Sequence, residues 1–421
     1  MKVFKFGGAS VKNAEAIKNV GSILLRYERD PIVIIVSAMG KTTNKLEEVL
    51  SHWVSKNELK FNHTVDELRD FHNEIAGALF HARHHKVFNF IDERFESLKN
   101  RFDRPLAEHL PFEYDQIVSL GEVLSSFIIS EYLVELGLRA RWVDARTLVR
   151  TDNRYQEGNV QWEKTEQLIT QCLPGADKET DKWVTQGFVG HTAEGFTTTL
   201  GREGSDYSGA IFAFGLKAES LTIWKDVPGL LNADPKLFSD TQKYEQLTYA
   251  EALEMTYYGA TVIHPKTIKP LQNAGISLLV KPFYAPEEAG TLISEKADKQ
   301  NLIPAIIVKK NQVLISISTT DFSFITENHL SELFATFAHL HIKLNTMQIS
   351  ALSFSVCIDY DAKRFQKLQA ALANGFKFKY NEALELITIR HFTPEKIDEL
   401  SAGRKVYMEQ LSRNTAQLVV Q

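Results

Sequence analysis

The chain has 421 residues, a formal net charge of −5 and a hydrophobic content of 44%. This length exceeds what one hydrophobic core usually supports, so we expect two or more domains. The weakly acidic balance excludes the strongly basic surface typical of proteins that bind nucleic acids or anionic membranes. No signal peptide is recognisable at the N-terminus and no later stretch is expected to span a bilayer, so the prediction is a soluble, cytoplasmic protein.

The cysteine content also argues for a reducing compartment. The only two cysteines, Cys172 and Cys357, are far apart in the chain and lie in apolar surroundings. Both are therefore expected to be buried thiols, and neither a disulfide nor a paired metal site is expected.

The chain begins with a short apolar run, residues 3–6, that continues directly into the glycine turn 7–10. Apolar residues at helical spacing follow from Val11 to Leu24, so the pattern predicts a strand, a glycine turn and a helix. Such a turn can hold a phosphate, and Lys5 just before it can reach a bound anion. The spacing matches neither a Walker loop nor a dinucleotide-binding motif, so the turn alone is a weak signal.

A second strand is predicted at residues 31–36, which form a continuous apolar run typical of a parallel strand covered on both faces. Together with the first strand and helix it makes a βαβ unit. The polar loop 37–44 follows it. Ligands bind at the carboxyl ends of parallel strands, so this loop is a candidate wall of the site.

Residues 46–102 carry a helical pattern rich in charge. The histidines at 81, 84 and 85 are interpreted as part of a solvated helix face, because no carboxylate or cysteine stands at a ligand spacing beside them. Residues 103–114 are predicted to be a connection with prolines. A long buried helix follows, with Glu122 near its start, where an acid could simply stabilise the helix dipole.

Further along, strands are predicted at 141–143 and 183–188, with a helix at 162–172 between them. The glycine-rich stretch 201–209 then precedes another apolar helix. Ser205 or Asp206 is expected to cap this helix, whose first-turn N–H groups suit an anion, and Arg202 offers a planar fork of donors. An ordinary glycine turn before a capped helix remains the alternative for this stretch alone.

The next elements repeat the alternation of strand and helix. A strand at 221–224 precedes the Pro-Gly turn at 228–229, helices follow at 249–258 and after 264, and a last strand lies at 276–280. This order predicts an α/β domain over residues 1–295, with a mostly parallel sheet sandwiched by helices.

Five segments together carry a family resemblance. Residues 5–10, 120–122, 198–206, 226–229 and 259–265 resemble, in order, the signatures of aspartate kinase (aspartokinase), a member of the amino acid kinase superfamily. The resemblance implies the amino acid kinase fold and transfer of the γ-phosphoryl group of MgATP to the side-chain carboxylate of L-aspartate. The product would be 4-phospho-L-aspartate, in the first step of lysine, threonine and methionine biosynthesis.

The resemblance also implies roles for individual residues. Lys5 and Asp206 would be catalytic: Lys5, together with Mg²⁺, would neutralise charge in the transition state, and Asp206 would orient Lys5. The aspartate carboxylate is already ionised near neutral pH, so no general base is needed. Mg²⁺ is expected to be held mainly by ATP, and no protein metal ligand is assigned.

The amino-acid substrate needs a cation for its α-carboxylate and an anion for its ammonium group. By the resemblance, Arg202 and Glu122 would supply these charges, with Thr43 and Ser205 as hydrogen-bonding neighbours.

The resemblance implies a larger set of nucleotide contacts. Besides Lys5 they are Phe6, Gly7, Gly8, Ser10, Ser37, Lys225, Asp226, Leu231, Lys236, Thr261 and Val262. Four positions depart from the family pattern, which usually has Thr at Ala9, an aromatic residue at Leu231, Arg at Lys236 and Lys at Thr261. These departures affect details of nucleotide contact and leave the acceptor chemistry intact.

The region 300–421 has a different, α+β rhythm. Strands are predicted at 302–308, 313–318, 354–358, 384–389 and 418–420, and helices at 330–340, 362–373 and near 396–411. This pattern resembles the tandem, ferredoxin-like ACT modules that follow the kinase domain in aspartokinases. The second module is expected to be truncated.

In the family these modules bind an amino-acid effector, here lysine or threonine, and Asn345 and Ser350 are the candidate contacts. Asn345 stands where the family usually has Asp, and Ala351 where it has Glu. Because two carboxylates that could bind a lysine ammonium are missing, we expect lysine inhibition to be weak, altered or absent. The modules would then mainly build a homodimer or a higher homo-oligomer.

Two other functions remain open from the sequence. A glutamate or acetylglutamate kinase would share the sheet and Lys5, but not the stretch from Arg202 to Asp206 combined with an ACT-like region. A non-catalytic amino-acid-binding regulator would have a decayed kinase site, whereas Lys5, Glu122, Arg202 and Asp206 are all present.

Overall fold

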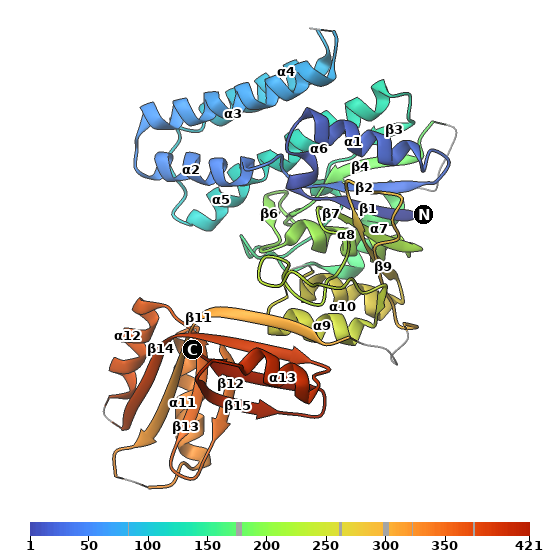
Figure 1. Cartoon of the computed structure of the whole chain (residues 1–421). Helices are drawn as coiled ribbons and strands as arrows, with labels where there is room; N and C mark the ends of the chain where they lie inside the picture. The colour runs from blue at the N-terminus through green and yellow to red at the C-terminus, as the bar shows by residue number, and fades with distance from the viewer. Residues whose placement is uncertain (83, 174–178, 261–262, 298–302, 322, 374) are drawn as a thin grey trace. The chain divides into compact units, whose positions relative to one another are not determined.

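The computed structural model describes residues 1–421 except 83, 174–178, 261–262, 298–302, 322 and 374 (Figure 1). The chain groups into two compact units, each described here by itself. The N-terminal unit comprises Met1–Leu230, Lys243–Leu253 and Val262–Asp298. The C-terminal unit comprises Leu231–Gln242, Glu254–Thr261 and Lys299–Gln421.

The N-terminal unit is built on an eight-stranded sheet with the strand order β3-β4-β2-β1-β7-β9-β10-β8. Among the described strand pairs of this sheet, only β9 and β10 run antiparallel. The strands are β1 (Lys2–Phe6), β2 (Ile32–Val36), β3 (Ala140–Trp142), β4 (Lys182–Gln186), β7 (Ser220–Lys225), β8 (Gln246–Leu247), β9 (Ser277–Pro282) and β10 (Thr291–Ile293). The mostly parallel sheet predicted from the sequence is confirmed.

Helices cover both faces of this sheet, which is why β2 is buried along its whole length. On one face, α1 (Ala14–Leu25) packs against α6 (Leu120–Glu135), which in turn contacts β2, β3 and β4. On the other face, α8 (Gly204–Gly215) contacts β1 and β7 and is flanked by α7 (Trp162–Cys172) and α10 (Pro265–Ala274). Helix α9 (Tyr249–Tyr258) precedes α10 in the chain, and its residues are divided between the two units.

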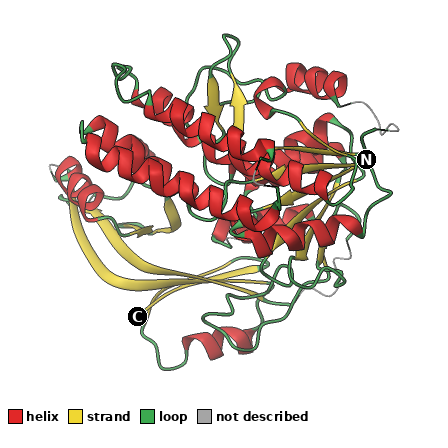
Figure 2. Ribbon diagram, turned by 90° about the horizontal axis from the view of Figure 1, so that it is seen from above, coloured by secondary structure: helices red, strands yellow, loops and turns green. Residues whose placement is uncertain are grey.

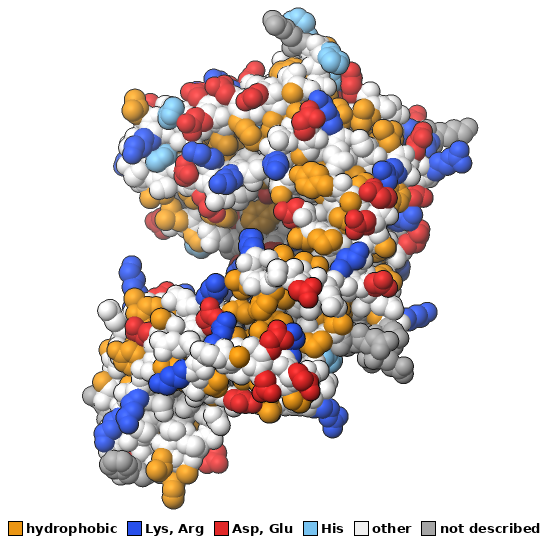
Figure 3. Space-filling view, in the orientation of Figure 1, with side chains coloured by type: hydrophobic (Ala, Val, Ile, Leu, Met, Phe, Trp, Pro, Cys, Tyr) orange, Lys and Arg blue, Asp and Glu red, His pale blue; other side chains and the backbone are white. Residues whose placement is uncertain are grey.

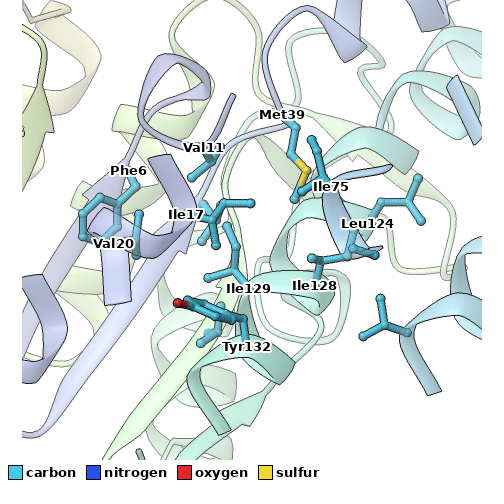
Figure 4. Packing of buried hydrophobic residues seen from close by; sticks show 14 of the residues in the cluster. Phe6, Val11, Ile17, Val20, Met39, Ile75, Leu124, Ile128, Ile129 and Tyr132 are labelled. Atoms are coloured by element: carbon cyan, nitrogen blue, oxygen red, sulfur yellow. The ribbon is translucent and has the colours of Figure 1, made fainter. Parts of the chain in front are cut away.

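Apolar side chains of α1, α6 and β1 pack together in one core. Ile17 of α1 faces Ile129 and Tyr132 of α6, and Phe6 of β1 lies at the side of this cluster (Figure 4). Met39 of the loop after β2 lies beside Ile75 in the same core (Figure 4). The core therefore fixes α6 and the loop after β2 against each other, and both carry predicted site residues.

The predicted helical region 46–102 contains three helices, α2 (Thr42–Val54), α3 (Glu58–Leu79) and α4 (Lys86–Lys99). Helices α3 and α4 lie side by side (Figure 1). A further helix, α5 (Leu110–Val118), occupies part of the expected connection 103–114. Its start carries Pro111, a residue that suits the first turn of a helix as well as a loop, so the proline was misleading there.

Helices α5 and α6 follow each other so closely that Leu110–Glu135 is long and apolar enough to cross a membrane by length and composition alone. However, 83% of its most apolar window is buried inside the protein. Such burial is typical of a core helix, so packing inside the protein explains the apolar residues of this segment.

Over the visible face of the molecule, acidic and basic side chains are interspersed (Figure 3).

One prediction about the cysteines is wrong. Cys357 is buried, but Cys172 is exposed. Cys172 ends the amphipathic helix α7, which buries Thr165 and Ile169 on its other face. Apolar neighbours in sequence therefore did not indicate a buried position.

The C-terminal unit contains a six-stranded antiparallel sheet with the order β12-β13-β11-β14-β16-β15. Its elements are β11 (Ala305–Thr319), α11 (Glu327–His339), β12 (Leu344–Ile349), β13 (Phe354–Asp359), α12 (Ala362–Leu372), β14 (Phe376–Arg390), α13 (Pro394–Ser401), β15 (Val406–Leu411) and β16 (Thr415–Val420). The long strands of this sheet are strongly curved (Figure 2). The antiparallel sheet with helices agrees with the predicted ACT-like fold.

Two details of this unit differ from the prediction. The two strands expected at 302–308 and 313–318 are one strand, β11, with register shifts between Lys309 and Leu314 and a positive φ of 55° at Asn311. Such a bulge interrupts the alternation of side chains without ending the strand. The helix expected near 396–411 ends at Ser401, because Gly403 has a φ of 70° and β15 follows.

Candidate active site

A cavity of about 680 Å³ lies in the N-terminal unit, at the carboxyl ends of β1, β2 and β7. Lys5 comes from β1, Ser37 and Ala38 follow β2, and Lys225 ends β7. Ligand sites of open α/β sheets form in this position, because loops from neighbouring parallel strands meet there.

Two lysines converge on one buried carboxylate in this cavity. The Nζ of Lys5 lies 2.5 Å from Oδ1 of Asp206, and the Nζ of Lys225 lies 3.1 Å from Oδ2. Burial alone would raise the pKa of Asp206, but the two ammonium groups outweigh it and hold that pKa below its ordinary value. Asp206 is therefore ionised, and it holds both lysines at the wall of the cavity.

The glycine turn after β1 leaves room for a ligand beside Lys5. A Cβ on Gly8 would lie 3.0 Å from the carbonyl oxygen of Ala38 and 3.3 Å from that of Gly40. A Cβ on Gly7 would lie 3.3 Å from the Nζ of Lys5. The turn after β1 and the loop after β2 can approach each other this closely only without side chains.

Helix α8 starts without the side-chain cap predicted from the sequence. Its N-cap residue is Glu203, which has a φ of 53° and makes no side-chain cap hydrogen bond, so capping by Ser205 or Asp206 is wrong. Both residues lie within the first turn instead. A Cβ on Gly187 would lie 2.7 Å from the Cβ of Ser205, so the missing side chain lets this turn rest against the end of β4.

Glu122 lines the same cavity from the first turn of α6. Gly121 makes this possible, since a Cβ there would lie 2.9 Å from the Cβ of Ala38. The Ala38 N–H donates to Oε1 of Glu122 at 3.4 Å, while Oε2 is buried without a partner among the described residues. Burial raises the pKa of Glu122 to about 8, and backbone N–H groups only partly offset it. A cation bound beside this carboxyl group would favour its ionised form.

Sequence reasoning missed Asp115, which organises one wall of the site from α5. Its carboxylate accepts hydrogen bonds from the Thr199 N–H at 2.9 Å, the Thr199 hydroxyl at 2.7 Å and the Gln156 N–H at 3.0 Å. Burial raises the pKa of Asp115 to about 6 against these hydrogen bonds. It therefore joins α5 to the strand β6 (Thr197–Thr199), which pairs with β5 (Val189–His191), and to the segment that carries Gln156.

Most of the residues predicted to bind substrates line this one cavity. They are Lys5, Gly8, Ser37, Thr43, Glu122, Arg202, Ser205, Asp206 and Lys225. Apart from residues of the stretches 37–44 and 201–209, four further residues line the cavity and were not predicted, namely Tyr114, Gln156, Glu157 and Phe188. No short motif marks them, because they come from the unpredicted helix α5 and from irregular segments.

The other predicted nucleotide residues lie elsewhere or are not described. Phe6 is fully buried in the core, and the Ser10 hydroxyl lies 3.5 Å from the carbonyl oxygen of Trp224. Asp226 is exposed next to Lys225. Leu231 and Lys236 belong to the C-terminal unit, and Thr261 and Val262 lie outside the described residues.

The two candidate effector residues differ in their surroundings. Asn345 is buried in the C-terminal sheet, where its amide accepts from Lys309 Nζ at 2.8 Å and donates to Gln312 and Asp359. Ser350 is exposed and its hydroxyl lies 2.8 Å from that of Ser353. The amide of Asn345 is therefore already occupied by groups of its own chain.

The residues of the cavity suit a nucleotide better than a metal ion held by the protein. Within the part of the chain that the structure describes, no three His, Cys, Asp or Glu residues form a group that could hold a metal ion. The cavity instead offers two ammonium groups and glycine backbone, which suits a triphosphate that brings Mg²⁺ on its own oxygens.

The chain is similar to known proteins over most of its length. The model of the amino acid kinase family matches residues 1–282. Lysine-sensitive aspartokinase 3 of Escherichia coli is 31% identical over 400 residues, which is 92% of this chain and 86% of that protein. Aspartokinase 2 of Arabidopsis thaliana, a chloroplast protein, is 31% identical over 85% of this chain and 66% of its own length.

Solved structures show the same similarity over the whole chain. E. coli aspartokinase III in complex with lysine and aspartate has a TM-score of 0.82 and 26% identity, over 100% of this chain and 96% of that chain. The complex of E. coli aspartokinase III with aspartate and ADP has a TM-score of 0.81 and 25% identity over the same shares. The family model, the sequence identity and the common fold thus lead to one conclusion: the chain belongs to the aspartokinases of the amino acid kinase family.

Proposed function

We propose that the cavity around Lys5 transfers the γ-phosphoryl group of MgATP to the side-chain carboxylate of L-aspartate, giving 4-phospho-L-aspartate. The main support is that Lys5, Lys225 and Asp206 share one cavity with Arg202 and Glu122. The first three suit a polyphosphate, and the last two suit the α-carboxylate and ammonium of an amino acid. The relative from E. coli binds aspartate and ADP.

In this proposal the residues act by charge and position. The aspartate carboxylate attacks phosphorus as an anion, so the protein must hold two negatively charged reactants together. Lys5 stabilises the charge that builds up between them, and Asp206 keeps Lys5 in place through the 2.5 Å ion pair. Mg²⁺, carried by the nucleotide, would supply further neutralisation of the phosphate oxygens.

Arg202 and Glu122 are proposed to set the orientation of the acceptor. Arg202 is exposed at the mouth of the cavity, and a guanidinium can hold an α-carboxylate by two parallel hydrogen bonds. Glu122 has no cation partner among the described residues, and the substrate ammonium would provide one. Thr43 and Ser205 line the space between as hydrogen-bonding groups.

The C-terminal unit is proposed to bind an amino-acid effector. We expect its binding of lysine to be weak or absent. The E. coli relative is crystallised with lysine. In this chain Asn345 stands where the family resemblance implies an acid, and its amide is engaged by Lys309, which already contributes an ammonium group at this point. We therefore expect lysine to inhibit weakly, and a titration that shows strong lysine inhibition of the purified enzyme would contradict this.

The oligomeric state and the cellular compartment are also proposals. We expect a homodimer or a higher homo-oligomer built through the C-terminal unit, to be measured by light scattering of the full chain. We expect the protein to act in the cytoplasm, although the plant relative is named as a chloroplast protein.

The deciding experiment is an acceptor panel. Purified protein with MgATP should release ADP, and form a hydroxamate with hydroxylamine, when L-aspartate is present but not with L-glutamate or N-acetylglutamate. Hydroxamate formation shows that an acyl phosphate is made. Turnover with glutamate alone would assign another amino acid kinase, and no turnover with any acceptor would favour a non-catalytic regulator.

A further inference from the structure

A second cavity of about 190 Å³ lies in the N-terminal unit, away from the residues assigned to either substrate. It is lined by α4 and the segment after it, by the junction of α5 and α6, by the short 3-10 helix η2 (Ala145–Thr147) and by β6. Three of its lining side chains are arginines, Arg94, Arg101 and Arg146. Among the described residues its lining contains no aspartate or glutamate.

The three guanidinium groups are not fully neutralised. Arg101 lies 3.0 Å from Glu113, and Arg146 lies 2.6 Å from Asp144. Arg94 has no ion-pair partner in the described part of the chain. Two carboxylates against three guanidinium groups leave one positive charge at this small, partly enclosed space.

Arg94 is held in place although it lacks an acidic partner. Its guanidinium carbon lies 4.7 Å from the centre of the Phe90 ring, and its Nε is buried with no hydrogen-bond partner among the described residues. A buried donor without a partner is costly unless something binds it. At Arg101, burial lowers the pKa of the guanidinium below its ordinary value, although the neighbouring Glu113 acts in the opposite direction.

We propose that this cavity, defined by Arg94, Arg101 and Arg146, binds a phosphate group. Guanidinium forks match the oxygens of a phosphate in pairs, and a phosphate provides the negative charge that the cavity lacks. Ser119, which is 2% exposed, adds a hydroxyl group at the start of α6. The volume accommodates inorganic phosphate or the phosphate end of a small phosphomonoester.

The cavity shares two structural elements with the active site. Gln116 lines it, and its side-chain amide donates to the Thr197 carbonyl oxygen of β6 at 2.8 Å and accepts from the Thr197 N–H at 3.2 Å. Strand β6 continues to Arg202, and Ser119 precedes Glu122 by one turn of helix. A bound phosphate would thus stiffen the elements that carry both proposed aspartate contacts and lower the KM for aspartate, an effect that rests on the proposed function.

Binding itself is tested without any activity measurement. Inorganic phosphate is titrated calorimetrically into the full chain at constant ionic strength, with chloride as the balancing anion. Three variants are compared. Arg94→Gln removes the proposed ligand, Lys5→Ala disables the phosphate-binding end of the active site, and Arg29→Gln removes an exposed arginine outside the cavity.

We expect saturable binding that weakens about tenfold or more in Arg94→Gln and persists in Lys5→Ala and Arg29→Gln. If Arg94→Gln does not fold, Arg94→Lys keeps the charge and loses the fork, and weaker binding is still expected. Absent binding, binding unaffected at Arg94, or binding lost only in Lys5→Ala would each overturn the proposal.

The source of the phosphate is resolved by a second titration with glycerol 3-phosphate. Tighter binding of this ester than of inorganic phosphate, still dependent on Arg94, assigns the site to a phosphorylated metabolite, and the reverse order assigns it to free phosphate. If phosphate binds through Arg94 but the KM for aspartate does not change, the site stands and the link to the active site is wrong.

Discussion

The ammonium of Lys5 lies 2.5 Å from the carboxylate of Asp206, although one comes from the first strand and the other from the first turn of α8. Their ion pair is almost fully buried, with side-chain exposures of 9% and 4%. Breaking such a pair leaves an uncompensated charge, so the two residues are expected to act as a unit. Lys225, on the other carboxylate oxygen, remains when Lys5 is removed.

The first prediction concerns Lys5→Ala. Turnover should fall by about 10²–10³ or more, because a positive charge aimed at the reacting phosphate is lost. Lys225 keeps Asp206 paired, so the fold should survive, as a thermal melt would show. Lys2→Ala, which removes a lysine of the same strand that pairs with Asp30, should keep near-normal kcat. Near-normal rates in Lys5→Ala would contradict the mechanism.

Arg202→Ala should mainly raise the KM for aspartate. The expected increase is about tenfold or more, since a charge-assisted hydrogen bond to the α-carboxylate is removed. The KM for ATP should change little. Steady-state kinetics with each substrate varied in turn measure both values, and Arg141→Ala on the exposed edge strand is the matched control. An equal rise in both KM values would show that Arg202 serves the nucleotide instead.

The raised pKa of Glu122 predicts a pH dependence of aspartate binding. With a pKa of about 8, the free carboxyl group is mostly protonated at neutral pH, and it must lose its proton to pair with the substrate ammonium. The KM for aspartate should therefore fall as pH rises towards 8, by nearly tenfold per pH unit below that value. Above pH 8 this effect should level off.

The variant Glu122→Gln isolates that effect. It should raise the KM for aspartate and remove its dependence on pH between 6 and 8. Glu131→Gln, which changes another buried acid of α6 that pairs with Lys86, should keep the dependence. A pH profile that survives in Glu122→Gln would assign the titration to a different group.

His72 predicts acid sensitivity of the fold. Its ring is fully buried between Phe71 and Phe95, its Nδ1 lies 2.7 Å from the Leu68 carbonyl oxygen, and burial lowers its pKa from 6.5 to about 4. The unfolded chain binds a proton near pH 6.5 and the folded chain does not. Stability from this residue is thus complete above pH 6.5 and lost progressively as pH falls to 4, by at most about 3 kcal/mol.

Replacing His72 by Leu should flatten the pH dependence of unfolding. The difference in unfolding free energy between pH 6.5 and 4.5, from urea melts, should be smaller than in the unchanged chain. His63→Leu, an exposed histidine of the same helix, should leave it unchanged. An equal loss of stability in the His72 variant would locate the acid sensitivity elsewhere.

The sequence predicted the parts of the fold that rest on local pattern. The apolar runs of β1 and β2 and the glycine turns indicated a parallel sheet, and the sheet is there. Local pattern could not show that β11 continues through a bulge, since Asn311 reads as a turn residue. It also extended the helix after Lys396 too far, because the polar pair Glu409 and Gln410 between Met408 and Leu411 is compatible with a helix as well as with a strand.

The sequence predicted the charged site residues whose side chains match the charges of the substrates. Lys5, Glu122, Arg202 and Asp206 line one cavity. Asp115 was missed because its importance comes from three hydrogen bonds to segments far away in the chain, Thr199 and Gln156, which no local spacing encodes. The exposure of Cys172 likewise depended on which face of α7 packs inward.

The C-terminal sheet has two halves, one bordered by β13 and the other by β16. The two 15-residue strands β11 and β14 pair with each other and run through both halves. Neither half can be excised without cutting through a strand of its neighbour. The two ACT-like halves must therefore melt together in hydrogen exchange, and they could not have been exchanged separately by recombination once the strands were shared.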